Sequence, residues 1–178
     1  MGIPADLQAD VQKIFDRIDA FESNLGAATA DELVGGYADA LSSDGSKWIA
    51  VLSNFSVGDK RLKLGHEGKL LERIIPLGRD SSCPIDVFGF ASNTTNANWS
   101  HEQNRDLALD RLEQAALFLT TGGNSFAGPG SVPSTLVTFR SGDSGETGDP
   151  GDENPDRRFV LIVVTLNGAT PPPPLASP

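Results

Sequence analysis

The sequence has few of the residues from which catalytic and metal sites are usually built. Its 178 residues include one cysteine, one methionine, one tyrosine and two histidines. The single cysteine, Cys83, excludes an internal disulfide, and we expect it to be a small buried apolar residue. The histidines, His66 and His101, lie far apart with no cysteine or glutamate at ligand spacing, so we expect no metal site.

Positive charge is scarce as well. The chain has 14 lysines and arginines against 24 aspartates and glutamates, a formal net charge of −10. Nucleic-acid binding requires a surplus of basic residues, so this balance argues against nucleic acid and against anionic membranes as partners. No apolar run approaches the ~20 residues that span a bilayer, which argues against membrane insertion.

The N-terminal segment, MGIPADLQADVQ, shows no targeting pattern. It lacks the basic start and the apolar core of a signal peptide. The sequence therefore predicts synthesis in the cytoplasm without a signal peptide. It leaves open whether the protein ends in an extracellular particle or at the cell envelope.

Motifs for cofactors and catalysis are also missing. No phosphate-binding loop and no dinucleotide-binding fingerprint occurs, so we expect no cofactor. Residues 142–145, Gly-Asp-Ser-Gly, match the nucleophile segment of chymotrypsin-like proteases, but neither histidine has the context of a catalytic base. We expect no catalytic residues. The surrounding acidic stretch, 141–156, fits a solvated insertion, with a calcium site as the alternative.

The N-terminal segment has the pattern of two helices. Its first part has an apolar stripe with a helical period, and a capping-box pattern at 29–32 predicts a second helix through Leu41. Residues 5–42 would then form a helical hairpin, which either packs on the main domain or docks on another subunit. The stripe consists of Leu7, Val11, Ile14, Ile18 and Phe21.

Strand and helix patterns alternate in the rest of the chain, which predicts an α+β domain with helices packed on a sheet. The strand over 84–92 is apolar on both faces, so we expect it at the centre of that sheet. The other predicted elements are strands over 47–55, 134–141 and 157–167, a helix over 65–78, and a longer helix from Ser100 to Gly122.

Three segments follow from these patterns. An N-terminal helical extension covers 1–45, the main domain covers 46–168, and a Pro-rich tail covers 169–178. The tail sequence, ATPPPPLASP, cannot form a helix, and we expect it to be extended.

The long helix carries a regular stripe beside the end of a strand. Asn104, Leu107 and Arg111 are three and four residues apart and share one helical face. An asparagine near a helix start can satisfy polar groups of the preceding loop. The guanidinium of Arg111 presents a planar fork of donors that suits a carboxylate. The stripe therefore indicates a binding site where the strand over 84–92 meets this helix.

The same residues carry a resemblance to a known family. The run from Asn104 to Arg111, Asn-Arg-Asp-Leu-Ala-Leu-Asp-Arg, is similar to that family's Asn-x-x-Leu-Ser-x-x-Arg helix motif. The pair Arg157 and Arg158 is similar to the arginine pair before its last strand. Residues 47–167 thus resemble the C-terminal domain of OmpA, the peptidoglycan-associated lipoprotein and MotB. The resemblance implies a two-layer β-α-β-α-β-β sandwich.

The resemblance also implies a ligand. In that family the helix arginine and an aspartate at the strand end grip diaminopimelate of the peptidoglycan stem peptide. Arg111 would take the carboxylate, whereas Ser92 stands at the position of the aspartate. A charge-assisted contact contributes about 1.5–3 kcal/mol, so its loss would weaken binding about ten- to a hundredfold. A structural alternative for Arg111 is pairing with Asp106, Asp110 or a carboxylate of a loop.

Three further residues complete the set. Trp99, just before the long helix, is either an anchor for a partner or an apolar contact at the helix start. Arg157 and Arg158 stand at a strand entrance and either balance the acidic stretch before them or bind a ligand. The candidate binding residues are Ser92, Trp99, Asn104, Leu107, Arg111, Arg157 and Arg158.

Two functions remain open at this point. In the first, a non-catalytic OmpA-like module is a structural adaptor subunit of a larger assembly, such as a secretion apparatus or a phage-tail-like particle, and acts through protein–protein contacts. In the second, the module binds peptidoglycan and anchors to the cell envelope. Ser92 at the aspartate position favours the first.

Overall fold

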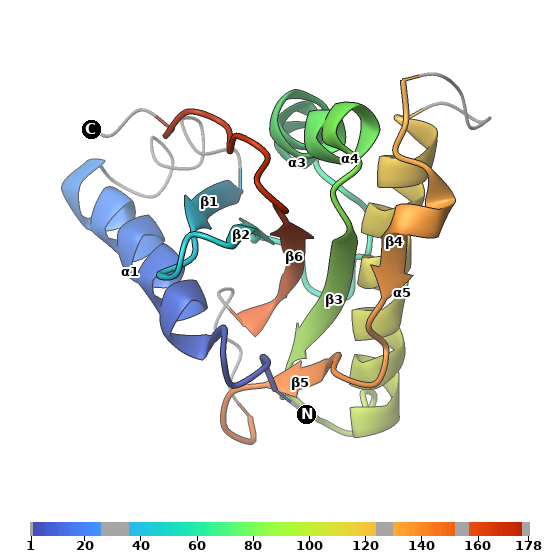
Figure 1. The fold of residues 1–178 in the computed structure, drawn as a ribbon. Coiled ribbons are helices and arrows are strands. Elements are labelled where there is room, and N and C mark those ends of the chain that lie inside the picture. Colours follow the sequence, from blue (N-terminus) through green and yellow to red (C-terminus); the bar gives the residue numbers. More distant parts are fainter. Residues whose placement is uncertain (1, 26–35, 124–129, 152–156, 176–178) are drawn as a thin grey trace.

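The computed structural model describes residues 2–25, 36–123, 130–151 and 157–175, and shows a sheet with helices on both faces (Figure 1). The strands are β1 (Tyr37–Leu41), β2 (Lys47–Leu52), β3 (Ile85–Ser92), β4 (Val137–Phe139), β5 (Gly145–Thr147) and β6 (Phe159–Thr165). The helices are α1 (Gln8–Leu25), α3 (Leu64–Lys69), α4 (Ile75–Ser81) and α5 (His101–Thr121), with a π-helical turn, Leu70–Ile74, joining α3 to α4.

The strand order is β1-β2-β6-β3-β4, with β5 also paired to β3. The first four strands in this order pair antiparallel, whereas β4 and β5 pair parallel with β3. Strands β2 and β3 therefore run parallel with β6 inserted between them. The prediction that the strand over 84–92 lies inside the sheet is confirmed, because β3 has neighbours on both sides.

The sheet is buried on both faces by two separate apolar clusters. Alternate residues of β6 point to opposite faces, as the period of a strand requires. Val160, Ile162 and Val164 join the cluster under α3, α4 and α5. Leu161 and Val163 join the cluster under α1. The fold is therefore α+β, as predicted, with α1 on one face and the other helices on the opposite face (Figure 1).

The apolar stripe predicted for the first helix is the face that packs on the sheet. Within the described part, Leu7, Val11, Ile14 and Ile18 are all buried. Phe15, between them, meets the ring of Phe159 edge-on with the centroids 5.0 Å apart. The side chain of Phe21 lies outside the described residues. The first helix thus packs on its own domain.

The predicted second helix is wrong at Tyr37–Leu41, which form the edge strand β1. This segment pairs with β2 along its whole length, and Tyr37 is fully buried. Gly36 precedes it with φ +71°, a conformation that breaks a helix. The long-range pairing outweighs a weak helical pattern. Residues 29–35 of that predicted helix lie outside the described residues.

The third predicted strand, over 134–141, is shorter than expected. A second short strand, β5, follows it along the chain and also pairs with β3. Ser134–Leu136 form a 3-10 turn, and β4 covers three residues after it. No pattern in the acidic stretch predicted β5, Gly145–Thr147, which lies inside it. Ser144 bridges the two pieces, because its hydroxyl accepts the N–H of Gly89 on β3 at 2.8 Å. Residues 152–156 of the acidic stretch lie outside the described residues.

Helix α5 begins and ends as predicted. Ser100 and Gln103 form a capping box, in which each side chain bonds the other residue's backbone N–H at 3.2 and 2.8 Å. Gly122, with φ +62°, ends the helix. The helix lies close against β3 because Gly89 has no side chain. A Cβ there would be 1.8 Å from the carbonyl oxygen of Ala108.

The described part of the tail, 169–175, contains no helix, as predicted. Arg73 in the π-helical turn donates to the carbonyl of Pro173 at 2.7 Å, and Leu175 packs against the apolar cluster of the sheet. Among the described helices, none is long and apolar enough to cross a bilayer.

Candidate binding pocket

Six of the seven candidate residues line one pocket of about 240 Å³ at the end of β3. Its other wall is the connection from β2 to α3, at Val57 and Gly58. We call it the Trp99 pocket. The six residues are Ser92, Trp99, Asn104, Leu107, Arg111 and Arg158. The structure thus brings together residues from β3, from α5, from the loop between them and from the position directly before β6.

Arg157 lies elsewhere. It is exposed and lines a second hollow of about 540 Å³, between α1 and β5, together with Phe15 and Glu146. Its neighbour Arg158 is the one that faces the Trp99 pocket.

Arg111 forms the floor of the pocket and has no exposed surface. Its Nε, Nη1 and Nη2 groups donate to the carbonyls of Asp59, Phe90 and Ser56 at 2.9, 3.1 and 3.3 Å. These acceptors lie on the β2–α3 connection and on β3, so the guanidinium ties the two walls together. In place of the pairing with Arg111 considered above, Asp110 lies 3.7 Å from Lys60.

The environment of Arg111 lowers its pKa to about 10, first because the group is buried and then because Arg158 is also positive. Asp59 opposes this with a smaller effect. A pKa of about 10 still leaves the guanidinium charged at neutral pH. Arg158 is 9 % exposed and donates its Nε–H to the carbonyl of Phe55 at 3.0 Å. Both arginines therefore hold the chain that follows β2.

Asn104 holds the loop between β3 and α5, several residues of which line the pocket. It is 3 % exposed, and its amide donates to the carbonyl of Thr94 at 2.7 Å. Its side-chain oxygen accepts the indole N–H of Trp99. The asparagine thus orients Trp99, which lines the pocket.

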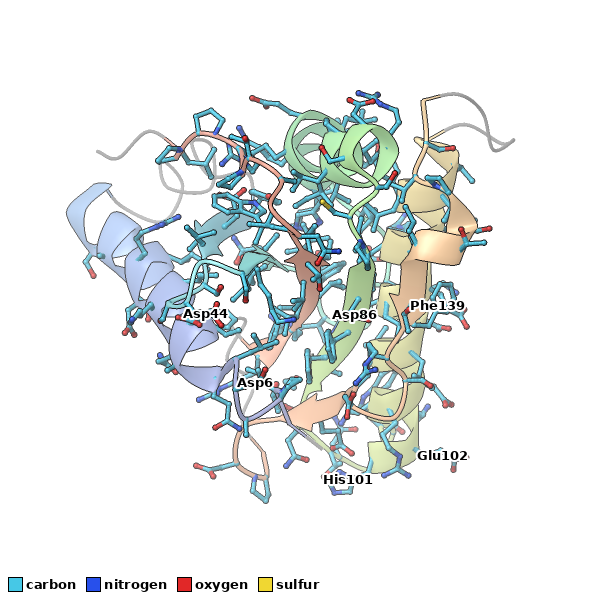
Figure 2. All side chains as sticks on the ribbon, viewed as in Figure 1. Asp6, Asp44, Asp86, His101, Glu102 and Phe139 are labelled. Carbon is cyan, nitrogen blue, oxygen red and sulfur yellow. The ribbon has the colours of Figure 1, made fainter. Side chains whose placement is uncertain are left out.

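Figure 2 shows the start of helix α5, at His101 and Glu102, at the same end of the molecule as β5.

Ser92 ends β3 and is 7 % exposed. Within the described part of the chain, no hydrogen bond joins its hydroxyl to another residue, so the hydroxyl is available to a ligand. None of the described residues that line the pocket is an aspartate or a glutamate. The pocket therefore combines two guanidinium groups with neutral polar and apolar walls.

His66 and Cys83 are both buried within the domain. His66 is buried, with Nε2 2.7 Å from the carbonyl oxygen of Ser53 and Nδ1 3.1 Å from the backbone N of Lys63. Cys83 is buried as predicted, and burial raises the pKa of its thiol, which keeps it protonated. Neither residue lines the Trp99 pocket.

Comparison with solved structures places this architecture. The chain is similar to the OmpA-like domain of FopA1 from Francisella tularensis subsp. tularensis, with 15% identity, 72% of this chain and 80% of that chain covered, and a TM-score of 0.55. It is similar to the periplasmic domain of Helicobacter pylori MotB, with 16% identity, 74% and 83% coverage and a TM-score of 0.52. A putative MotB-like protein from Desulfovibrio vulgaris gives 14% identity, 88% and 94% coverage and a TM-score of 0.52.

No family model and no curated protein matches the sequence. The sheet order and the two helical layers define a mixed α+β domain with a pocket at the end of β3. The structural similarities identify this fold as that of the OmpA C-terminal-like domain, which confirms the resemblance of residues 47–167.

Proposed function

We propose that this chain is a non-catalytic OmpA-like module that binds peptidoglycan through the Trp99 pocket and thereby ties a larger assembly to the cell envelope. The observation that carries this proposal is the gathering of six candidate residues around one pocket with two arginines. One similar structure is a periplasmic domain, which supports a place in the envelope. The side chain of His66 contacts backbone groups through both ring nitrogens, and Cys83 is buried, which supports a role without catalysis.

A second candidate remains, in which the module is an adaptor that contacts protein subunits and does not bind peptidoglycan. Two observations favour it. Ser92 provides no carboxylate for an ammonium group, and three N–H groups of Arg111 already donate to backbone carbonyls. A sacculus-binding experiment separates the two candidates.

The variant for this experiment should leave the buried arginines in place. Val57 lines the pocket and is 77 % exposed, so Val57→Glu adds a negative charge at the rim without disturbing the core. Leu64 is 86 % exposed and does not line the pocket, which makes Leu64→Glu a matched control. Both changes replace an exposed apolar side chain by the same carboxylate.

We expect purified sacculi to retain the wild-type protein and Leu64→Glu, and to bind Val57→Glu about tenfold more weakly. The added carboxylate competes with the ligand's carboxylate for the arginines. Co-sedimentation over a range of sacculus concentrations measures this. If sacculi do not retain the wild type, the peptidoglycan proposal is wrong and the adaptor function takes its place. Equal loss in both variants would place binding outside the pocket.

A further inference from the structure

Among the described residues, the charged side chains that line the Trp99 pocket are both positive. Arg111 lies in the floor and Arg158 at the wall. The two guanidiniums are close enough for the charge of Arg158 to lower the pKa of Arg111. A carboxylate that enters the pocket is attracted by both, whereas an ammonium group is repelled by both.

The carboxylates of Asp59, Asp106 and Asp110 line a neighbouring hollow, and two of the three have basic partners. The carboxylate of Asp59 accepts from the backbone N–H and the guanidinium of Arg61, with a guanidinium contact of 2.9 Å, and does not line the pocket. Asp110 lies 3.7 Å from Lys60. None of these three carboxylates lines the Trp99 pocket. An ammonium group in the pocket would therefore meet neutral acceptors only among the described lining residues.

The remaining lining fits a peptide group and a small side chain. The hydroxyl of Ser92 and the side chain of the exposed residue Asn98 offer neutral hydrogen-bonding groups. Trp99 and Leu107 offer apolar surface. The volume of about 240 Å³ is below the ~300–1,000 Å³ of pockets for drug-sized ligands, which suits the end of a chain.

We propose that the Trp99 pocket receives the terminal carboxylate of a peptide, whose neighbouring nitrogen is an uncharged amide, in preference to a free zwitterionic amino acid. The inference rests on the proposed function in taking this pocket as the ligand site, and it specifies the class of ligand. Arg158 and the charge of Arg111 attract the carboxylate. Ser92 bonds the peptide group, and Trp99 covers a small side chain.

The test uses small probes and the two tryptophans. N-acetyl-D-alanine and N-acetyl-L-alanine carry the carboxylate beside an amide, free alanine adds the ammonium, and N-acetylalanine N-methylamide removes the carboxylate. The indole N–H of Trp99 reports on the pocket by NMR. The indole of Trp48 is an internal control, because it is buried and donates to Asp39 at 3.2 Å, away from the pocket.

We expect N-acetylalanine to shift the Trp99 signal and not that of Trp48, and to bind at least about tenfold more tightly than free alanine or the N-methylamide. A preference for the D form would indicate the end of a cell-wall peptide, and a preference for the L form the end of a protein; either supports the proposal. Free alanine binding as tightly as N-acetylalanine would overturn it, as would the absence of any Trp99 shift.

Ser92→Asp tests the same inference by changing the protein instead of the ligand. A carboxylate beside the arginines should weaken N-acetylalanine about tenfold and reverse the preference towards free alanine. An unchanged Trp48 signal checks the fold, and Val57→Glu, at the exposed rim, provides a second variant that should weaken N-acetylalanine without touching the interior. An unchanged affinity for N-acetylalanine in both variants, or an unchanged preference in Ser92→Asp, contradicts the proposal. Retention of the wild type on sacculi separates this failure from failure of the proposed function.

Discussion

At the scale of single residues, Arg111 supports the pocket mainly through its hydrogen bonds to the backbone, because its own side chain is fully buried. The sequence placed it beside a strand end with a donor fork suited to a carboxylate. The structure uses three of those donors for the carbonyls of Ser56, Asp59 and Phe90. Backbone carbonyls that leave water need a donor, and a charged donor stabilises them more than a neutral one. Arg111 thus holds the two walls of the pocket at a fixed separation.

This role predicts a loss of stability when the guanidinium is removed. Arg111→Met keeps much of the volume but leaves the carbonyls of Ser56, Asp59 and Phe90 without this donor, so we expect the free energy of unfolding to fall by about 3 kcal/mol or more. Urea denaturation measures the change. Arg105→Met is the control, because Arg105 is 60% exposed and its ion pair with Glu146 is long, at 3.8 Å. We expect that control to change stability by less than about 1 kcal/mol. Similar losses in both variants would contradict this role for Arg111.

At the scale of elements, the approach of α5 to β3 positions the pocket, because the two provide four of its candidate residues, Ser92, Asn104, Leu107 and Arg111. The approach depends on Gly89, where a Cβ would lie 1.8 Å from the carbonyl oxygen of Ala108. Real Cβ atoms do not approach backbone oxygens so closely, so any larger residue must push the helix from the sheet.

Gly89→Ala should therefore lower the free energy of unfolding by about 3 kcal/mol or more, since the helix or the strand must shift to relieve the overlap. Gly68→Ala is the matched control in α3, where an added Cβ meets nothing within 4 Å. Because alanine is the better helix former, we expect this control to be neutral or to stabilise by up to about 1 kcal/mol. Thermal unfolding of the two variants compares them directly. Equal midpoints would mean that the close packing of α5 is not needed.

At the scale of the whole molecule, the tail and the first strand belong to one network. Asp39 of β1 is buried, and its two carboxylate oxygens accept from Arg73 at 2.6 and 3.0 Å. Arg73 also donates to the carbonyl of Pro173 in the tail. The π-helical turn that carries Arg73 lies between α3 and α4. One guanidinium thus joins the edge of the sheet, a helix and the C-terminal segment.

Ending the chain after Thr170 should lower the free energy of unfolding by about 1–3 kcal/mol, because Arg73 loses the carbonyl of Pro173 and the sheet loses the contact with Leu175. Urea denaturation of the shortened chain measures this. Pro174→Ala provides the control, because Pro174 is exposed, and we expect a change within about 0.5 kcal/mol. A shortened chain as stable as the full chain would show that the tail contacts contribute nothing.

The sequence by itself determined the elements whose pattern repeats locally. The stripe of α1, the apolar β3 and β6, and the capping box of α5 are all read from residues close together in the chain, and all appear in the structure. The helix motif also predicted that Asn104, Leu107 and Arg111 share one helical face, and all three line the Trp99 pocket at the end of β3.

Tertiary structure decided what depends on distant partners. Tyr37–Leu41 became a strand because β2 lies beside it, and Gly145–Thr147 joined the sheet because β3 offered an open edge. The local pattern of apolar residues shows which face of a strand is buried. It does not show which distant strand will pair with it. For the same reason the sequence could name Arg111 but not its three carbonyl acceptors, and could not tell which of Arg157 and Arg158 faces the Trp99 pocket.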